Sequence, residues 1–299
     1  MGFRNIYIQK PTRLSIRRQQ LVIQQEEDYT IPVDDINSIM IDHPQCTITT
    51  PALSVLAEAE VAVFTCDQKH LPCAIILPVG QYFKKFEALT IQMHVRSKLK
   101  DRLWQKVMKQ KIANQAKCLA LNGRPSVELE VMGKQVIEGD RSHQESQAAR
   151  LYFRLLFNDQ FTRRTDDVLN GALNYGYAII RGAVARDICA YGFEPALGLF
   201  HHNELNPFNL ADDLMEPFRP FVDLWVSQNI EQLEKVLTSE NKQALFALLF
   251  TEVLIDGEYH TLNNAIHKVV SSYTMCCRND SAAGLKLPEL VLLRAHEYE

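Results

Sequence analysis

Short apolar runs, cut repeatedly by turn residues, occupy residues 1–80. β-branched residues are frequent in these runs, a pattern typical of strands that cover a core. The sequence therefore predicts strands at residues 6–8, 20–24, 29–33, 36–41, 61–66 and 73–77. The last two can pair as a hairpin. The segment TTPALSVLAEAE at residues 49–60, in which a Thr-Pro start signal precedes helix formers, predicts one short helix.

The period of the apolar positions becomes helical at Tyr82 and stays so until Asn122-Gly123 ends the pattern. The remainder is predominantly helical, and a Pro and Gly pair at residues 78–80 marks the change of pattern. The predicted fold class is α+β, with a small N-terminal β-strand domain at residues 1–80 and a larger all-α domain at residues 81–299. Further helices are expected at residues 126–138, 142–157, 166–191, 209–227, 230–236, 241–255 and 260–272.

Composition narrows the class of protein. With 299 residues, 46% of them hydrophobic, the chain can bury a substantial core, and a net charge of −4 argues against a surface coated with basic residues. The seven cysteines are scattered without a Cys-x-x-Cys pair, as in proteins whose thiols stay reduced. The start lacks an apolar signal region, and ALFALLF from Ala244 is too short to span a membrane. We expect a soluble, cytoplasmic protein that does not contact a membrane.

The average charge hides a local contrast. Residues 81–124 carry eleven basic and two acidic side chains, a local charge of +9 that leaves −13 for the rest of the chain. A solvated helix face explains such a segment without any partner. The alternative is a DNA backbone, because each Lys or Arg paired with a phosphate releases condensed counterions. The candidate DNA-binding residues are Lys84, Lys85, Arg96, Lys98, Arg102, Lys106 and Lys109.

Two histidines and, after them, the acids Asp212, Asp213 and Glu216 lie within HHNELNPFNLADDLMEPFRP at residues 201–220. This stretch is either a solvated loop that runs into a charged helix or one half of a divalent-metal site. Asp213 and Glu216 are three positions apart, so on a helix they share one face. Pro217 would kink that helix and turn the Glu216 carboxylate toward a cleft. In the structural alternative, Asn209 or Asp212 caps the helix and the acids only complement its dipole.

Two further candidates have equally ordinary explanations. His201 and His202 are adjacent, so in an extended segment they point in opposite directions and at most one serves the same site. Either can instead be a core or surface histidine. Glu145 lies in the first turn expected for HQESQAARLYFRLLF, where a glutamate also stabilises a helix N-terminus without any ligand.

Taken together, these motifs resemble a known family, the CRISPR-associated integrase that is the catalytic subunit of the spacer-acquisition complex. The resemblance is carried by ESQAARLYF, by ALNYGYAIIRGAVARDICAYGFEPALGLFHH at residues 172–202 and by NPFNLADDLMEPFRPFVD at residues 206–223, in that order. SIMIDHPQCTITTPALSVLAEAEVAVFTCD and HLPCAIILP also look like the β domain of the family. The match runs from about residue 1 to about residue 225 and is most similar to the type II branch.

The resemblance implies the residues of a metal site. The metal-binding glutamate of the family falls on Glu145, its histidine on His201 and its second acid on Glu216, with Asp213 as an assisting carboxylate. These three would be both the catalytic residues and the metal ligands. Carboxylates suit Mg²⁺ or Mn²⁺, and an imidazole is tolerated, especially by manganese. Asn174, Tyr175, Tyr177, Tyr152 and Arg219 are expected to pack around the site and orient it, or simply to be core residues.

The resemblance also implies a reaction and an assembly. The 3′-OH ends of short captured double-stranded DNA would attack phosphodiesters of the CRISPR repeat array, as part of antiviral defence. Residues 1–80 would supply dimerisation and partner contacts, and residues 81–299 would be the catalytic domain. A homodimer, a small ferredoxin-like partner subunit that completes a heterohexamer, and the type II RNA-guided effector nuclease are the implied partners. A net charge of −4 predicts a narrow, salt-sensitive DNA path.

Two other functions remain open on sequence grounds. A catalytically silent DNA-binding subunit of the same assembly would keep the fold, although competent residues at all three ligand positions favour an enzyme. An unrelated metal hydrolase would leave the basic segment and the LNYGY motif unexplained.

Overall fold

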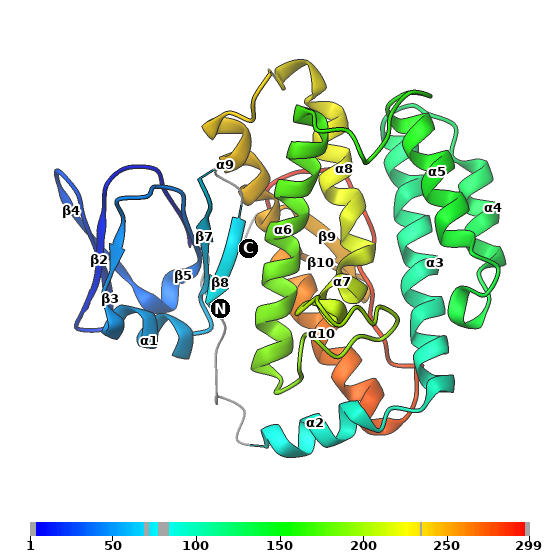
Figure 1. Cartoon of the computed structure of the whole chain (residues 1–299), viewed down its shortest axis with the longest axis horizontal. Coiled ribbons are helices and arrows are strands. Elements are labelled where there is room, and N and C mark those ends of the chain that lie inside the picture. The colour runs from blue at the N-terminus through cyan, green and yellow to red at the C-terminus, as the bar shows by residue number, and fades with distance from the viewer. Residues whose placement is uncertain (1–3, 69–71, 77–83, 234, 297–299) are drawn as a thin grey trace. The chain divides into compact units, whose positions relative to one another are not determined.

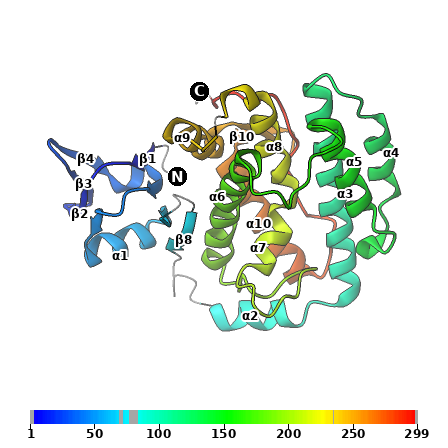
Figure 2. The same ribbon diagram turned by 45° about the horizontal axis from the view of Figure 1, so that its top comes forward.

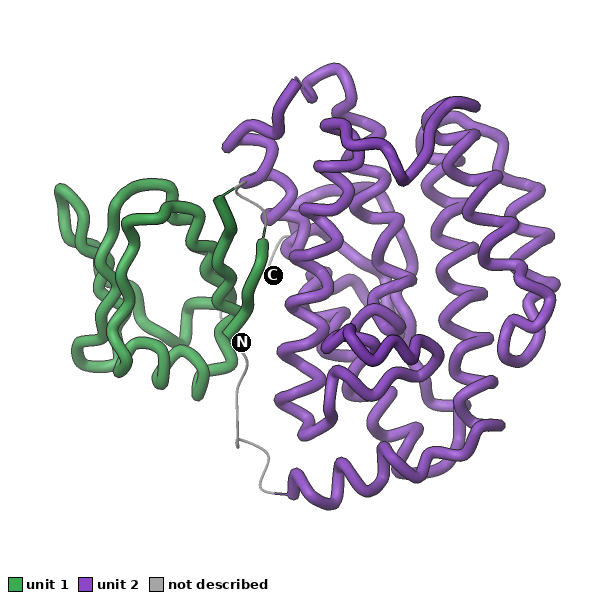
Figure 3. The backbone as a smooth tube through the Cα atoms, in the orientation of Figure 1, with its two compact units in different colours: residues 1–83 green, residues 84–299 purple. Residues whose placement is uncertain are grey.

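The computed structural model describes residues 4–68, 72–76, 84–233 and 235–296. The chain divides into two compact units, residues 1–83 and 84–299 (Figure 3). The change of pattern expected at residues 78–80 lies outside the described residues. Strands and one helix form the first unit, and the second is mostly helical (Figure 1). The predicted order of a β domain followed by a helical domain is therefore confirmed.

Two four-stranded sheets in the first unit share one apolar core. One sheet has the order β1-β5-β7-β8 and the other β4-β3-β2-β6. Leu14 and Leu21 of the second sheet belong to the same buried cluster as Ile39 and Val63 of the first and Leu56 of helix α1. The elements are β1 Arg4–Ile8, β2 Arg13–Arg17, β3 Gln20–Gln24, β4 Asp28–Pro32, β5 Ile36–Ile41, β6 Thr47–Ile48, α1 Thr50–Glu58, β7 Ala62–Cys66 and β8 Pro72–Ile76.

Most predicted elements of this unit are present, and two strands were missed. Thr49 caps α1 by accepting the backbone N–H of Ala52, and β7 pairs antiparallel with β8, as the sequence predicts. The missed strands β2 and β6 pair with each other. β2 joins β3 through Arg18 and Gln19, whose φ angles are 51° and 60°. Because neither residue is Gly or Asn, the usual sequence signal of a tight hairpin is absent there.

The second unit consists mostly of helices that pack against one another (Figures 1 and 2). α3 packs against α4 and α5 on one side, and α6 packs against α7, α8 and α10. The elements are α2 Lys85–Met93, α3 Ser97–Leu121, α4 Val127–Gln135, α5 Gln144–Leu156, α6 Val168–Ala190, α7 Asn209–Met215, α8 Arg219–Gln228, α9 Ser239–Ala247, β9 Glu252–Ile255, β10 Glu258–Thr261 and α10 Leu262–Asn279, with 3-10 turns at Glu138–Asp140, Glu216–Phe218, Ile230–Gln232 and Leu248–Phe250.

Several predicted helices of this unit were wrong in extent, and the one expected at residues 230–236 is only a 3-10 turn at Ile230–Gln232. The helical pattern after Tyr82 is broken between α2 and α3, because Arg96 adopts an extended conformation (φ −64°, ψ 140°). The helix expected at residues 241–255 ends at Ala247, and β9 follows, so the domain is not all-α. β9 pairs antiparallel with β10 through Asp256 and Gly257, whose φ angles are 59° and 80°. Asp-Gly is a strong hairpin signal, and it was present in the sequence.

The segment after α10 is tied into the helical unit. Leu254 and Glu289 form an antiparallel bridge, as do Thr251 and Ala295. The Asn114 side chain of α3 donates to the carbonyl of Pro288 at 2.9 Å and accepts the N–H of Leu290 at 3.0 Å. Asn114 is 2% exposed, so α3 and this segment share a buried polar junction.

None of the helices in the described ranges combines the length and the apolar character that crossing a membrane requires. All seven cysteines are free thiols; Cys118, Cys276 and Cys277 are buried, while Cys73 is exposed.

Candidate functional site

Glu145 is placed by the start of α5. The carboxylate of Asp140 accepts the backbone N–H groups of Gln144 at 2.9 Å and of Glu145 at 3.0 Å. These are two of the N–H groups that a helix start leaves without partners, so Asp140 performs the capping role that Glu145 could have had. The Glu145 side chain is 29% exposed and free to serve another purpose.

Glu216 lies where the helix predicted at residues 209–227 breaks. α7 ends at Met215, a 3-10 turn spans Glu216–Phe218, and α8 begins at Arg219. Pro217 and Pro220 each lack a backbone N–H, which explains the interruption. The Glu216 side chain is 6% exposed, and Arg219 Nε lies 2.8 Å from its Oε1. α7 has no side-chain cap, so the alternative in which Asn209 or Asp212 caps the helix is wrong.

A lysine of α3 connects the two glutamates. Lys111 Nζ lies 2.7 Å from Glu145 Oε1 and 2.5 Å from Glu216 Oε2. These two carboxylate oxygens are therefore at most 5.2 Å apart, the sum of the two distances. The Lys111 side chain is 8% exposed. Two acids far apart in sequence thus share one buried cation.

Charge pairing changes the titration of this group. Burial alone would raise the pKa of Glu216, but the Arg219 and Lys111 cations outweigh it and lower the pKa to about 2. Burial lowers the pKa of Lys111, but Glu216 and Glu145 together raise it above its ordinary value. Glu216 is ionised and Lys111 protonated at neutral pH.

His201 is held by Asp213. His201 Nδ1 lies 2.6 Å from Asp213 Oδ1, and that carboxylate also accepts backbone N–H groups from Leu199 at 2.6 Å, Phe200 at 2.9 Å and His201 at 3.2 Å. The hydrogen bond to Asp213 raises the pKa of His201, and the charges of Glu216 and Glu145 act in the same direction. Because Nδ1 donates to Asp213, Nε2 is the ring nitrogen left for a ligand.

The loop before His201 has a tight backbone geometry. A Cβ on Gly198 would lie 2.0 Å from the carbonyl oxygen of His201 and 3.1 Å from Asp213 Oδ2. Only glycine fits there, which gives a physical reason for the Leu-Gly pattern before the histidine. Trp104 of α3 stacks on Phe200, with centroids 4.3 Å apart, and meets the His201 ring edge-on at 5.9 Å.

Arg219 packs on an aromatic ring that is itself hydrogen-bonded to a buried carboxylate. The Arg219 guanidinium lies 4.5 Å from the centroid of the Tyr177 ring. The hydroxyl groups of Tyr177 and Tyr152 both donate to the buried carboxylate of Asp223. Burial raises the pKa of Asp223 to about 6 against these two hydrogen bonds. Tyr177 and Tyr152 therefore hold the Asp223 carboxylate, and Tyr177 also contacts Arg219, while exposed Asn174 accepts a hydrogen bond from Arg163.

The described residues contain no preformed cluster of three His, Cys, Asp or Glu side chains spaced to hold a metal ion. Between Glu145 and Glu216 the Lys111 ammonium lies where such an ion would bind. The donor set nevertheless suits Mg²⁺ or Mn²⁺, with two carboxylates and one imidazole. Glu216 Oε2 is buried and accepts no well-formed hydrogen bond from the described part of the chain, so its only partner there is the Lys111 charge. The residues fit a divalent ion once Lys111 moves.

Several basic residues after residue 81 form ion pairs with acidic residues in the folded chain. Arg96 pairs with Asp280, and Arg102 pairs with Glu138 at 3.0 Å. Lys84 lies 3.6 Å from Glu87, Lys85 is half-buried, and Lys98 is exposed. Acids from distant segments thus reduce the local excess of positive charge.

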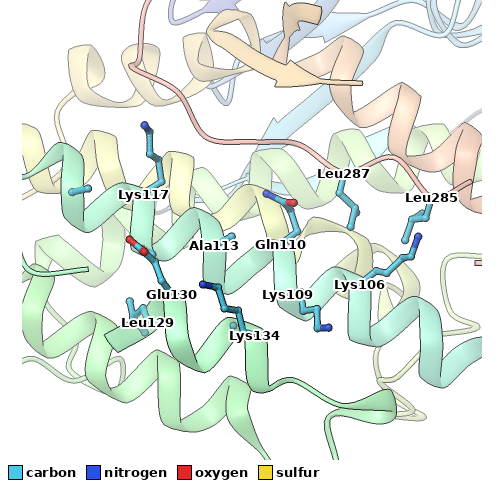
Figure 4. Close-up of a pocket in the computed structure, with 13 residues that line it drawn as sticks. Lys106, Lys109, Gln110, Ala113, Lys117, Leu129, Glu130, Lys134, Leu285 and Leu287 are labelled. Carbon is cyan, nitrogen blue, oxygen red and sulfur yellow. The ribbon is translucent and has the colours of Figure 1, made fainter. Parts of the chain in front are cut away.

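A lysine-lined groove runs along the outer side of α3. Its volume is about 930 Å³, and α4 and residues 285–287 form its other walls (Figure 4). Lys109 and Lys111 are two positions apart, so their side chains leave the helix about 200° apart. The groove and the carboxylates consequently lie on opposite sides of α3. The charged residues that line the groove are Lys106, Lys109, Lys117, Lys134 and Glu130.

The structure joins Glu145 and Glu216 through Lys111 and brings His201 near enough for their charges to raise its pKa, but it gives Asp213 a different part from the one expected. Asp213 is fully occupied by backbone N–H groups and His201, so it orients the histidine. His202 is exposed. Sequence reasoning missed Lys111, Trp104 and Asp140. A signal existed for Lys111, since it lies four positions after buried Val107 on the apolar stripe of α3.

Comparisons with known proteins show the family to which the chain belongs. The model of the family described as CRISPR associated protein Cas1 matches residues 6–245. The CRISPR-associated endonuclease Cas1 of Neisseria meningitidis serogroup C is 43% identical over 304 aligned positions, which cover 100% of both chains. The resemblance carried by the ESQAAR, LNYGY and LADDLMEPFRP motifs is confirmed.

Solved structures match at lower identity and show the fold alone. A casposase bound to integration product has a TM-score of 0.72 at 19% identity and covers 93% of this chain and 90% of its own. A Cas6-RT-Cas1–Cas2 complex has a TM-score of 0.71 at 16% identity and covers 97% of this chain and 36% of its own. With a family model that spans most of its length and a full-length relative at 43% identity, this chain belongs to the Cas1 family.

Proposed function

We propose that this chain is a metal-dependent DNA integrase and endonuclease of CRISPR adaptation. One observation carries the proposal: Glu145 and Glu216 share one buried cation near His201. Asp213 holds the His201 ring through Nδ1, which leaves Nε2 for a ligand. The full-length relative from Neisseria meningitidis is described as an endonuclease, and the casposase of similar fold is bound to an integration product. Both descriptions support a reaction on DNA.

The proposed reaction is a transesterification. The 3′-OH of a short captured DNA attacks a phosphodiester of the repeat array, and a new P–O bond forms as the P–O bond in the recipient strand breaks. The recipient strand leaves with its own 3′-OH, so the number of phosphodiesters is unchanged and no ATP is needed. Water in place of the 3′-OH gives endonuclease cleavage.

Each side chain of the site has a defined part in this reaction. Glu145, Glu216 and His201 Nε2 would hold Mg²⁺ or Mn²⁺, which polarises the phosphodiester and stabilises the charge that develops on its oxygens. Asp213 keeps the imidazole in one orientation, and Arg219 keeps the Glu216 carboxylate ionised and in place. Burial of Glu216 excludes water from one side of the site.

The proposed partners follow from the family. Residues 1–80 would supply contacts of a homodimer and of a small ferredoxin-like subunit, which together form a heterohexamer. The match to a complex that contains Cas1 and Cas2 supports an assembly of this kind. The type II RNA-guided effector nuclease is a further proposed partner.

The lysine-lined groove is proposed to hold DNA backbone away from the reacting phosphate. Lys106 and Lys109 line this groove, and Lys109 is exposed. Because the groove lies across α3 from the carboxylates, its lysines act on affinity and leave the reaction itself to the site residues. Further proposed contacts to the DNA backbone are Lys84, Lys85, Arg96, Lys98 and Arg102. The contacts of Arg96 and Arg102 are weakened by their acidic partners.

Joining of a short duplex with free 3′ ends into supercoiled plasmid tests the function. Glu145→Gln, His201→Ala and Glu216→Gln are each expected to abolish joining in Mg²⁺ or Mn²⁺. Glu240→Gln is the matched control, because this glutamate of the same unit is exposed and does not line the groove. Joining that survives in all three site variants refutes the assignment. DNA binding without joining in the native chain favours the silent architectural subunit.

A further inference from the structure

Lys111 is a buried cation for which the proposed reaction has no use. It belongs to the apolar stripe of α3, together with buried Val107, Met108 and Ile112. A lysine is almost never fully buried unless it is paired, and here both partners are the candidate metal ligands. Its ammonium is within direct contact of one oxygen from each glutamate. A purely structural lysine could be placed against either acid alone.

The charges of the metal-free site balance. Glu145 and Glu216 contribute two negative charges, and Lys111 and Arg219 contribute two positive charges. Removing one partner from a buried ion pair leaves an uncompensated charge, which is strongly unfavourable. Without a metal ion, Lys111 therefore keeps two carboxylates together that would otherwise repel.

A divalent ion at the same oxygens changes this balance to an excess of two positive charges. The ion and the ammonium also compete for the same space, because Glu145 Oε1 and Glu216 Oε2 are no more than 5.2 Å apart. Lys111 has four flexible methylene groups, so its ammonium can swing away without movement of α3. A phosphodiester anion would then offset part of the positive excess.

We propose that Lys111 is the resident counter-ion of the Glu145–Glu216 pair, that a divalent ion must displace it to bind, and that the displaced ammonium contacts the DNA phosphate. The inference rests on the proposed metal site. It makes Lys111 a competitor of the metal before the reaction and a partner of the substrate afterwards. A fixed structural ion pair would show neither behaviour.

The first half is tested without metal. In EDTA, the melting temperatures of the native chain, Lys111→Met, Glu145→Gln and the double variant form a double-mutant cycle. We expect Lys111→Met to lower the melting temperature and Glu145→Gln to relieve most of that loss, because the uncompensated carboxylate is gone. Lys117→Met, an exposed lysine of the same helix, is the control and should leave the melting temperature unchanged. Additive effects of Lys111→Met and Glu145→Gln would overturn the resident counter-ion.

Displacement of Lys111 by a divalent ion is tested with Mn²⁺ as the probe. Titration calorimetry and the electron paramagnetic resonance signal of the free ion both measure Mn²⁺ affinity. We expect Lys111→Met to bind Mn²⁺ about tenfold more tightly than the native chain and Lys117→Met to match the native chain. Saturating Mn²⁺ should restore the melting temperature that Lys111→Met loses in EDTA. In Mn²⁺, Lys111→Met should also bind a short duplex more weakly than the native chain.

The outcomes separate this inference from the proposed function. If Mn²⁺ binds the native chain, Glu216→Gln abolishes that binding and Lys111→Met leaves it unchanged, then displacement is refuted and the metal site stands. If neither the native chain nor Lys111→Met binds Mn²⁺, the metal site itself fails. If Lys111→Met does not fold, Lys111→Gln, which keeps a hydrogen-bond donor without the charge, replaces it in every arm.

Discussion

The imidazole of His201 and the carboxylate of Asp213 form a 2.6 Å hydrogen bond between Nδ1 and Oδ1, inside a turn that Asp213 itself holds together. Asp213 is fully buried and accepts the backbone N–H groups of Leu199, Phe200 and His201. One carboxylate therefore fixes both the path of the loop and the direction of the ring. Such partners of metal-binding histidines set the tautomer and raise ligand basicity.

Asp213→Asn is expected to weaken both metal binding and DNA joining by about 10- to 100-fold, because the amide cannot accept all the N–H groups that the carboxylate accepts. Mn²⁺ titration and the plasmid joining assay measure the two effects. Glu204→Gln, in an exposed position of the same loop region, is the control and should behave as the native chain. Native metal affinity in Asp213→Asn would show that the imidazole is positioned by other contacts.

Gly171 and Gly176 of α6 provide a matched pair of substitutions that tests the close packing of α6 against α8. A Cβ on Gly176 would lie 2.5 Å from Cγ1 of Val222 in α8, whereas a Cβ on Gly171 would meet nothing within 4 Å. Gly176→Ala is expected to lower the free energy of unfolding by about 1–3 kcal/mol through overpacking. Gly171→Ala should raise it by about 0.5–1 kcal/mol, because alanine is the better helix former. Urea denaturation measures both.

A second substitution, at Val222, checks that the clash with this side chain causes the loss of stability in Gly176→Ala. In the Gly176→Ala background, Val222→Ala should recover part of the lost stability, although the same change alone removes buried apolar volume and is destabilising. Equal effects of alanine at positions 171 and 176 would contradict close contact between α6 and α8.

The sequence was most informative where periodicity or a family motif was strong. The β-rich start and the Thr-Pro start of α1 followed from pattern, and the family followed from its motifs. The three dispersed site residues stay a prediction of that resemblance. The β9–β10 hairpin was missed because the apolar run from Ala244 was assigned to a helix at residues 241–255, which left Asp256-Gly257 as a connection between two helices. The break between α2 and α3 carries no Gly or Pro, so sequence alone offered no signal for it.

The site itself was less predictable than the residues that compose it. The family resemblance implied that Asp213 would assist a metal, but its oxygens are committed to backbone groups that no sequence pattern reveals. Lys111 was counted only as one of the basic residues of segment 81–124, although its position on the apolar stripe of α3 indicates burial. Long-range pairing decides such cases, since α3 meets α5 and the turn at Glu216 only in the folded chain.

Asp223 is expected to give stability a pH dependence. Its pKa is raised to about 6 from the unfolded value of 3.8, so the folded state binds the proton more tightly than the unfolded state does. The resulting stabilisation is complete below about pH 4 and is lost as the pH rises through about 6. The free energy of unfolding of the native chain should fall by about 1 kcal/mol more than that of Asp223→Asn between about pH 5 and pH 7.

Urea denaturation of both chains at the two pH values measures this difference, and comparison within the pair cancels the titration of groups that the two chains share. Tyr152→Phe removes one of the two hydroxyl donors to Asp223. It should therefore raise the pKa of Asp223 further and move the loss of stability to higher pH. A difference that does not vary with pH would show that Asp223 titrates alike in the folded and unfolded states.

The groove lysines are expected to control DNA affinity through counterion release alone. Each phosphate contact contributes about 0.9 to the slope of the logarithm of affinity against the logarithm of salt concentration. Lys106→Gln together with Lys109→Gln should therefore reduce the magnitude of this slope by about 2 and weaken duplex binding at low salt. Mn²⁺ affinity should stay native, because both residues lie across α3 from the carboxylates. Fluorescence anisotropy of a labelled duplex over a range of salt concentrations measures the slope, and exposed Lys235→Gln is the control. An unchanged slope in the double variant would exclude the groove from the DNA path and leave the remaining basic residues to account for binding.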